Sequence, residues 1–169
     1  SSSEQIAVGH LDGRVSFWPK PDVAPLSAPA KSNAAAHAQP IAVFGSAPML
    51  AWAGYDGGVH LWNTSTPDRQ PQIIGKSLGR VTALAVDVEG NQILAGTLGG
   101  DIAIWDLDDL SAPFHKLVGH ASQITSLAVA AGGRLASGSL DNTIRLWNLA
   151  RTDLPPVTID HGAWVWSVV

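Results

Sequence analysis

The sequence predicts an all-β fold made of four repeated units, and two observations support this fold class. First, four tryptophans recur at intervals of 44, 43 and 42 residues, and the segments that precede them align without gaps. They are Trp18, Trp62, Trp105 and Trp147. Second, no segment shows the apolar period of about 3.6 residues that marks an amphipathic helix. Self-similarity at a period of about 20 to 50 residues is typical of repeat architectures, so we expect one structural unit per interval.

Each unit is expected to contain a second and a third strand joined by a tight turn. The segments share an apolar run, a turn containing Gly or Asp, and an alternation that ends at the tryptophan. They are IAVGHLDGRVSFW (6–18), LAWAGYDGGVHLW (50–62), ILAGTLGGDIAIW (93–105) and LASGSLDNTIRLW (135–147). This pattern is typical of an antiparallel hairpin. In the third unit we expect Gly99-Gly100 to form a primed turn with positive φ.

Two further strands complete each unit. The innermost strand is a short apolar run, as expected of a strand buried on both faces. These runs are IAVFG (41–45), VTALAV (81–86), ITSLAV (124–129) and VWSVV (165–169). The outer strand is weaker and contains Pro, which an edge strand tolerates. The outer strands are QPQIIG (70–75), PFHKLV (113–118) and PPVTID (155–160). The Pro- and Ala-rich residues 19–36 are expected to form an insertion: an enlarged outer loop with a poorly encoded outer strand.

Four-stranded units at this period, with a tryptophan closing the third strand, resemble the WD-repeat (WD40) family of β-propellers. The resemblance covers nearly the whole chain and is most specific at 119–149, where Gly119-His120 precedes LASGSLDNTIRLWNL. The dipeptide that begins with the tryptophan varies: Trp105-Asp106, Trp62-Asn63, Trp147-Asn148 and Trp18-Pro19. The resemblance implies a β-propeller of four-stranded blades, with four repeats in residues 1–169.

The resemblance also implies a buried, hydrogen-bonded set in each blade. Its members are a His before the innermost strand, a Ser or Thr on the second strand, an Asp in the next turn, and the Trp. The fourth repeat matches fully, with His120, Ser137, Asp141 and Trp147. The second repeat offers His37, Asp56 and Trp62, with Trp52 in the Ser position. The first offers Asp12 and Trp18, and the third keeps Trp105 alone.

A Ser, a His and an Asp in one set also raise the hypothesis of a hydrolase. Ser137 stands in the middle of a predicted strand, with no strained elbow and no oxyanion donors beside it. We therefore interpret the set as structural: buried polar groups that satisfy one another and confer register and rigidity.

The two ends of the chain are expected to complete one blade. The chain opens at a second strand (5–8) and closes on a first strand, so 164–169 would complete the blade begun at 5–18. From Val165 to Ile6 across the ends takes 10 residues, against 9, 12 and 11 for the same connection elsewhere. His161 would take the His position of that blade. Two chains exchanging these strands would form an eight-bladed ring, of which this chain is half. A four-bladed ring and a segment of a longer propeller remain alternatives.

Composition narrows the function classes. Net charge is −4 without a visible basic stripe, so we expect no nucleic-acid partner. No apolar run is long enough to cross a membrane, so we expect no membrane partner. No metal-ligand spacing, phosphate loop or carboxylate pair is visible, so no cofactor, metal or catalytic residue is assigned. The chain has no cysteine, which is compatible with a reducing compartment, and we expect a cytoplasmic protein.

By its resemblance, the chain is expected to be a non-catalytic protein-interaction scaffold that binds proteins or peptides on the narrow face of the propeller. There the loops before the innermost strands meet the turns between second and third strands. The candidate residues are Trp164, Tyr55, Arg80, Gln123, Leu98, Leu140 and Leu11. Trp52 and Trp166 are expected to pack between blades. The alternatives are an enzyme or small-ligand binder using the central channel, and a regulatory segment of a larger protein.

Overall fold

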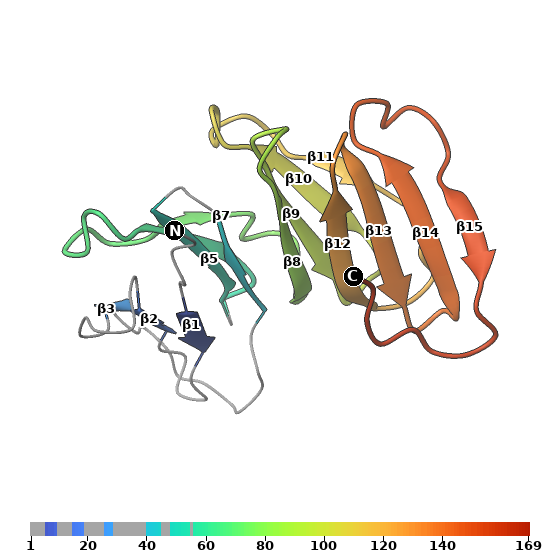
Figure 1. Cartoon of the computed structure of the whole chain (residues 1–169), viewed down its shortest axis with the longest axis horizontal. Coiled ribbons are helices and arrows are strands. Elements are labelled where there is room, and N and C mark those ends of the chain that lie inside the picture. Colours follow the sequence, from blue (N-terminus) through green and yellow to red (C-terminus); the bar gives the residue numbers. More distant parts are fainter. Residues whose placement is uncertain (1–5, 10–14, 19–25, 29–39, 45–47, 55) are drawn as a thin grey trace.

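The computed structural model describes residues 6–9, 15–18, 26–28, 40–44, 48–54 and 56–169. In these residues it contains fifteen β-strands and no helix, so the all-β fold class is confirmed for them. The strands form four antiparallel sheets, which are arranged as successive blades (Figure 1). Adjacent strands in the sequence are neighbours in each sheet, as expected of repeated up-and-down units.

Within the described residues, three blades have four strands and one has three. Blade 1 contains β1 (Ile6–Gly9), β2 (Val15–Trp18) and β3 (Leu26–Ala28). Blade 2 contains β4 (Ile41–Val43), β5 (Met49–Ala53), β6 (Val59–Asn63) and β7 (Gln72–Ile74). Blade 3 contains β8 (Val81–Asp87), β9 (Gln92–Thr97), β10 (Ile102–Asp106) and β11 (His115–Leu117). Blade 4 contains β12 (Ile124–Ala130), β13 (Arg134–Ser139), β14 (Thr143–Asn148) and β15 (Val157–Asp160).

The tryptophan has the same register in every blade. It lies opposite the first residue of the second strand in blade 1 and opposite the second residue of that strand in blades 2 to 4. The pairs are Ile6 with Trp18, Leu50 with Trp62, Ile93 with Trp105, and Leu135 with Trp147. The gapless alignment of the sequence therefore corresponds to a gapless alignment of the hairpins. The short strand β3 lies inside the Pro- and Ala-rich insertion and pairs with β2 as an outer strand.

The apolar core consists of layers between adjacent blades. One cluster joins blades 1 and 2, a second joins blades 2 and 3, and a third joins blades 3 and 4. In the third cluster, Leu94 and Ile102 of blade 3 pack with Leu135 and Trp147 of blade 4. Each blade therefore covers one face of its neighbour, because a single sheet cannot bury its own apolar faces.

A glycine and a threonine allow adjacent blades to contact each other closely. A Cβ added to Gly96 would lie 2.6 Å from the Ile124 side chain, so the absence of a side chain lets β12 approach blade 3 closely. The Thr82 hydroxyl donates to the carbonyl oxygen of Ile124 at 2.6 Å and to that of Gly96 at 3.3 Å. We call the hydroxyl bond from one inner strand to the next the threonine clasp.

The threonine clasp recurs between blade 4 and the C-terminal tail (163–169). The Thr125 hydroxyl donates to the Val165 carbonyl oxygen at 2.6 Å and to the Gly138 carbonyl oxygen at 3.0 Å. A Cβ added to Gly138 would lie 2.6 Å from the Val165 side chain. Val165 therefore contacts blade 4 in the same way as Ile124 contacts blade 3. Ile124 begins the innermost strand of the following blade, so Val165 has the position of such a strand.

Two expectations about the tail need correction. Residues 164–169 form no strand in the single chain, because no second strand of their own blade lies beside them. The tail is held instead by Val165 N–H, which donates to the Ser139 carbonyl oxygen at 3.1 Å. Trp166 was expected to pack between blades, but 67% of its surface is exposed. Trp52 does pack between blades 1 and 2, as expected.

The turn of blade 3 also differs from its prediction. Only Gly100 has positive φ (90°), so the turn is not a primed two-residue turn. Thr97 N–H donates to the Asp101 carbonyl oxygen at 3.0 Å, and Gly100 N–H donates to the Thr97 carbonyl oxygen at 3.2 Å. These bonds enclose a three-residue loop whose last residue is left-handed. Asn142 occupies the matching position of blade 4 with φ of 70°.

Candidate functional site

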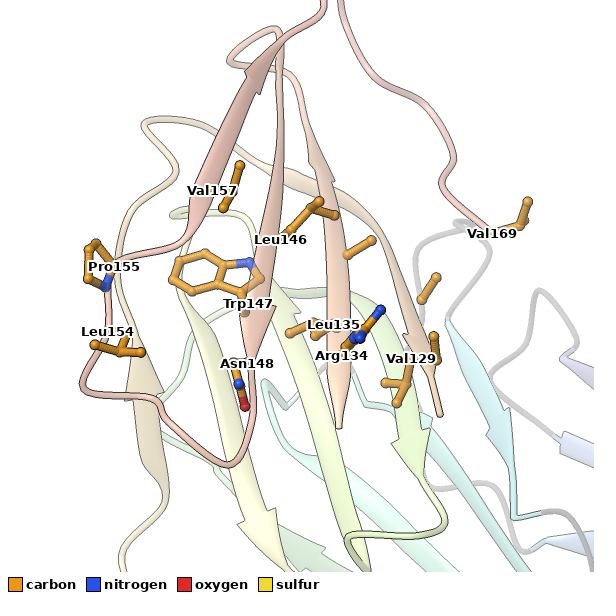
Figure 2. Close-up of a pocket in the computed structure, with 13 residues that line it drawn as sticks. Val129, Arg134, Leu135, Leu146, Trp147, Asn148, Leu154, Pro155, Val157 and Val169 are labelled. Carbon is orange, nitrogen blue, oxygen red and sulfur yellow. The ribbon is translucent and has the colours of Figure 1, made fainter. Parts of the chain in front are cut away.

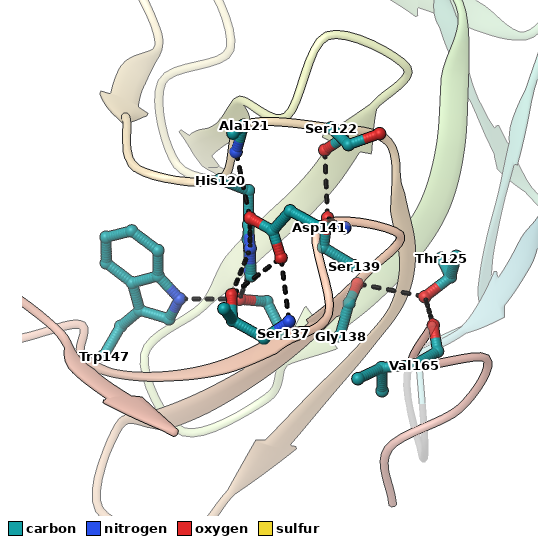
Figure 3. A network of polar contacts seen from close by, with 11 residues as sticks. His120, Ala121, Ser122, Thr125, Ser137, Gly138, Ser139, Asp141, Trp147 and Val165 are labelled. Carbon is teal, nitrogen blue, oxygen red and sulfur yellow. Dashed lines mark hydrogen bonds and ion pairs between the residues drawn. The ribbon is translucent and has the colours of Figure 1, made fainter. Parts of the chain in front are cut away.

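The polar set predicted in blade 4 forms a continuous chain of hydrogen bonds (Figure 3). Trp147 Nε1–H donates to Ser137 Oγ at 2.8 Å. Ser137 Oγ lies 2.8 Å from His120 Nε2, and His120 Nδ1 lies 2.9 Å from Asp141 Oδ2. His120, Ser137 and Trp147 are buried, and Asp141 is half-buried. The expected contact between His120 and Asp141 is confirmed.

A neutral His120 satisfies the bonding pattern. Because Ser137 Oγ accepts from Trp147, its own hydrogen is available to donate to His120 Nε2. His120 Nδ1 then carries the proton that is donated to Asp141. This assignment follows from the network, in which a neutral imidazole satisfies every member. Burial lowers the pKa of His120, and the hydrogen bond and charge of Asp141 only partly offset that effect.

Asp141 is held as a carboxylate. Burial alone would raise its pKa, but hydrogen bonds outweigh burial and leave the pKa far below its ordinary value. The Thr143 hydroxyl donates to Oδ1 at 2.7 Å, and the Ala121 N–H donates to Oδ2 at 2.9 Å. Asp141 therefore ties the loop before β12 to the turn between β13 and β14. Sequence analysis missed Thr143, although its position two residues after an Asp is typical of an Asx turn.

The Ser–His–Asp distances resemble those of a hydrolase, but the surroundings of the serine do not. Ser137 has no exposed surface, and it lies inside β13 rather than on a turn. One lone pair of its oxygen is occupied by the Trp147 indole. A nucleophile needs access to substrate and donors for the developing oxyanion, so this geometry favours a structural role.

The other blades carry incomplete sets. In blade 2, Asp56 Oδ1 lies 3.1 Å from His60 Nε2, within the same hairpin. Trp52, which replaces the serine, stacks on His60 with ring centroids 5.2 Å apart. The buried Nε1 of Trp62 consequently has no hydrogen-bond partner among the described residues. His37 and Asp12 lie outside the described residues, as does the Trp18 side chain.

In blade 3, Trp105 packs in an apolar cluster and contacts Phe114 with ring centroids 5.3 Å apart. The blade substitutes apolar contacts for the polar set, as its sequence predicts. His161 is exposed, and its Nδ1 lies 3.2 Å from the Ala163 carbonyl oxygen. His161 lies just before the tail. Its expected partner Asp12 is outside the described residues, so the pairing of His161 with an Asp stays a prediction.

The candidate narrow-face residues come together in pairs. Leu98 N–H donates to the Arg80 carbonyl oxygen at 2.9 Å, and Leu140 N–H donates to the Gln123 carbonyl oxygen at 3.0 Å. Each turn therefore lies beside the loop that precedes the innermost strand of its own blade. Leu98 is 49% exposed and Arg80 is exposed, whereas Gln123 and Leu140 are partly buried. Tyr55 and Leu11 lie outside the described residues.

Trp164 occupies the corresponding position before Val165. It is 59% exposed and meets Trp166 edge to face, with ring centroids 5.9 Å apart. Within the described residues, no group of three His, Cys, Asp or Glu side chains is placed to hold a metal ion. Nor does this part of the chain contain a helix that is long and apolar enough to span a membrane.

Comparison with known proteins agrees with the blade architecture. Residues 111–148 match the family described as WD domain, G-beta repeat. Cell division control protein 4 of Candida albicans is 26% identical over 138 residues, which cover 73% of this chain and 20% of that protein. NACHT domain- and WD repeat-containing protein 1 of Mus musculus is 33% identical over 84 residues, covering 49% of this chain and 5% of that protein.

Apoptotic protease-activating factor 1 of Rattus norvegicus is 29% identical over 130 residues, which cover 71% of this chain and 10% of that protein. The chain thus spans a fifth or less of the length of these three relatives. Residues 111–148, which contain the complete polar set of blade 4, are thus similar to a WD repeat, and the four blades agree with the resemblance of the chain to WD40-repeat proteins.

Proposed function

We propose that the chain is a non-catalytic scaffold that binds proteins or peptides on its narrow face. The observation that carries the proposal is the backbone hydrogen bond, present in blades 3 and 4, between the turn that follows the second strand and the loop before the innermost strand. This bond holds Leu98 beside Arg80 in blade 3 and Leu140 beside Gln123 in blade 4. Trp164 has the position in the tail that Arg80 and Gln123 have before their innermost strands. The sheet of blade 3 supports Leu98 and Arg80, both of which are exposed, so little ordering of these two residues is needed when a partner binds.

The residue types fit a binding surface. Trp and Arg are the side chains most enriched at the energetic centres of interfaces, where they supply apolar area together with a polar group. Trp164 and Leu98 expose apolar surface, and the exposed Arg80, whose carbonyl oxygen accepts from Leu98 N–H, supplies a cation. A peptide with apolar anchors and a carboxylate has the complementary chemistry.

A peptide selection tests this proposal. Random peptides are selected on the immobilised chain, and their affinity is then measured for the wild type, Leu98→Ala and Trp164→Ala. We expect either substitution to weaken binding by about tenfold or more, because interface centres contribute over about 1.4 kcal/mol. Val88→Ala is the matched control, since Val88 is 64% exposed and lies beyond the opposite end of β8.

An equal loss in Val88→Ala would show that binding does not depend on the narrow face. If no peptide is selected, or if neither Leu98→Ala nor Trp164→Ala weakens binding, the proposal is wrong. Circular dichroism of each variant establishes that the fold is intact before the affinities are compared.

A second candidate function is that of a regulatory segment within a larger protein. It is favoured by the relatives, because the matched part is a small share of each and one is named for both a NACHT domain and WD repeats. In that case the narrow face would bind another domain of the same protein. Selected peptides that match a sequence elsewhere in the larger protein would support this candidate.

The proposal extends to assembly and location. We place the scaffold in the cytoplasm, with no nucleic-acid or membrane partner, and propose that two copies associate through their ends. Self-association is supported by the apolar side chains that blade 4 leaves exposed, since Leu146 is 43%, Ile159 is 44% and Val157 is 63% exposed.

A further inference from the structure

A small cleft opens between blades 3 and 4 at the end opposite the narrow face. Its walls are the turn that follows β8, the turn that follows β12 and the loop that follows β14. Arg80 of the narrow face precedes the first residue of β8, whereas Asp87 is the last residue of that strand. We call this the acidic cleft. It has a volume of about 300 Å³ and is lined in part by Asp87, Glu89, Gln92, Gly132, Leu149 and Ala150.

Asp87 is a buried carboxylate with one oxygen unpaired. The residue is 4% exposed, and the Gly90 N–H donates to its Oδ1 at 3.0 Å. Within the described residues, no group donates a hydrogen bond to Oδ2. Because buried polar atoms in folded proteins are normally hydrogen-bonded, Oδ2 is suited to accept a hydrogen bond from a bound group.

Gly90 keeps the space beside Asp87 Oδ2 open. Its φ is not positive, and the left-handed conformation in this turn belongs to Asn91, with φ of 51°. The backbone therefore does not require glycine at position 90. A Cβ added to Gly90 would meet Asp87 Oδ2, and Gly90 itself lines the acidic cleft. The absence of a side chain here gives a ligand access to the unpaired oxygen.

Glu89 supplies a second carboxylate at the junction of the two blades. Its Oε2 accepts from the Gly132 N–H of the blade 4 turn at 3.0 Å. Within the described residues, neither Asp87 nor Glu89 forms an ion pair with a Lys or an Arg. Arg134, which follows the cleft residue Gly133, lines a different, apolar groove of about 510 Å³ in blade 4 (Figure 2). The acidic cleft therefore carries negative charge that no neighbouring cation pairs with in the described part of the chain.

Leu149 and Ala150 give the acidic cleft an apolar wall. The Leu149 N–H donates to the Gly133 carbonyl oxygen at 2.8 Å, which fixes this wall against the turn after β12. A long basic side chain packs its methylene stem on apolar surface of this kind and extends its charged group beyond it. A metal ion has no use for an apolar wall, and no group of three His, Cys, Asp or Glu in the described part of the chain is placed to hold one.

We infer that the acidic cleft binds an arginine side chain of a partner peptide. The planar guanidinium group presents its N–H donors in a fixed fork, so it can donate to Asp87 Oδ2 and to Glu89 Oε1 together. The stem of the arginine then lies on Leu149 and Ala150. The cleft volume of about 300 Å³ is at the lower end of the range of roughly 300–1,000 Å³ for ligand sites, which suits a single side chain. The site is separate from the narrow face, so this inference does not rest on the proposed function.

A titration followed by NMR tests the inference on the whole chain. The isotope-labelled protein is titrated with the peptide acetyl-Gly-Gly-Arg-Gly-Gly-amide. The matched ligand carries citrulline in place of arginine, which keeps the shape of the side chain and removes its charge. We expect saturable shifts of the Gly90 and Gly132 amide signals with the arginine peptide. The citrulline peptide should bind at least about tenfold more weakly, because a charged donor forms the stronger hydrogen bond to a carboxylate.

A charge-removing variant tests the role of Asp87. Asp87→Asn keeps an acceptor for the Gly90 N–H, and we expect it to weaken binding of the arginine peptide by about tenfold or more. Asp160→Asn is the matched control, since Asp160 Oδ1 likewise accepts from a glycine N–H, that of Gly162 at 2.9 Å. Asp160 lies opposite Thr143, at the end of blade 4 away from the cleft. Its exposed charge is screened by salt, so this variant should bind within about twofold of the wild type.

A second variant tests the space beside Oδ2 without changing the charge. In Gly90→Ala the added methyl group occupies this space, so the arginine peptide should bind about tenfold or more weakly. Gly99→Ala is the control, because its Cβ would meet only the Thr97 side-chain oxygen at 3.8 Å, and it should bind like the wild type. Gly90→Ala also decides the matter if Asp87→Asn does not fold.

Four results would each overturn the inference. The first is that the Gly90 and Gly132 signals show no saturable shift, and the second is equal affinity for the citrulline peptide. The third is an equal loss in Asp87→Asn and Asp160→Asn, which would indicate attraction to the overall negative charge of the chain. The fourth is wild-type affinity in Gly90→Ala. None of these results affects the proposed binding on the narrow face, which is tested separately through Leu98 and Trp164.

Discussion

Replacing Ser137 with alanine removes the hydroxyl group at the centre of the blade 4 network. Two hydrogen bonds of 2.8 Å are lost, one from the Trp147 indole and one to His120 Nε2. Their partners stay buried, because Trp147 is 8% and His120 is 6% exposed. The change removes a single oxygen atom, which leaves too little room for a water molecule to replace the hydroxyl.

The expected loss follows from the two groups left unpaired. A buried donor or acceptor without a partner costs about 1–3 kcal/mol, so two such groups lead us to expect that Ser137→Ala lowers the free energy of unfolding by about 2–6 kcal/mol. That is a large share of the roughly 5–15 kcal/mol that stabilises a typical domain. Blade 2 indicates that one such group is tolerated, since the Trp62 indole already lacks a partner among the described residues.

Urea unfolding followed by tryptophan fluorescence measures this loss. The midpoint should fall while the dependence of free energy on urea stays unchanged, because the surface exposed on unfolding is the same. Ser65→Ala is the control, since Ser65 lies exposed in the turn after β6. A loss below about 0.5 kcal/mol, no larger than that of an ordinary surface substitution, would refute the idea that the network stabilises the blade.

Three further predictions concern the pH dependence of stability, the turn of blade 3 and the threonine clasp. The low pKa of Asp141 contributes to the free energy of unfolding above about pH 4, and this contribution is lost on acidification. The pKa of His120 is also lowered, so the free energy of unfolding begins to fall below about pH 6.5, where the unfolded chain binds a proton that the folded chain does not. Asp141→Asn should therefore flatten the pH dependence of the urea midpoint below about pH 4, and an unchanged slope would contradict the assignment. Gly100→Ala should cost about 1–3 kcal/mol in thermal unfolding, because φ is 90° and an added Cβ would meet the His120 carbonyl oxygen, whereas the control Gly99→Ala meets only a side-chain oxygen at 3.8 Å. Thr125→Val should cost about 1 kcal/mol and speed amide exchange at the tail, and unchanged exchange would show that the clasp does not hold it.

The strand content could be predicted from the sequence because each tryptophan marks the same register position. The alternation before Trp147, for example, predicts the third strand, and the partner of Trp147, Leu135, is the second residue of the second strand. The polar set of blade 4 could be predicted because every member matches the family pattern. Local periodicity and a short motif determine these features, and both are visible in one chain.

Turn geometry, side-chain pairing and burial depend on contacts in three dimensions, and these features could not be predicted from periodicity and motifs. The turn at Gly99-Gly100 closes from Thr97 to Asp101, and composition does not distinguish a loop of two residues from one of three. The pairing of Asp56 with His60 was missed because Trp52, rather than a serine, stands beside it in the sheet. The exposure of Trp166 reflects the absence of a covering blade in the single chain.

The threonine clasp has a consequence for how chains of this kind can change. The acceptor of each clasp is a main-chain carbonyl oxygen, that of Ile124 or of Val165, so this hydrogen bond requires no particular side chain on the receiving strand. The constraint on the receiving residue comes instead from packing, because the side chains of Ile124 and Val165 are buried against Gly96 and Gly138. Duplication or shuffling of whole repeats in the gene can therefore keep the clasp at a new junction without a matching change in its acceptor.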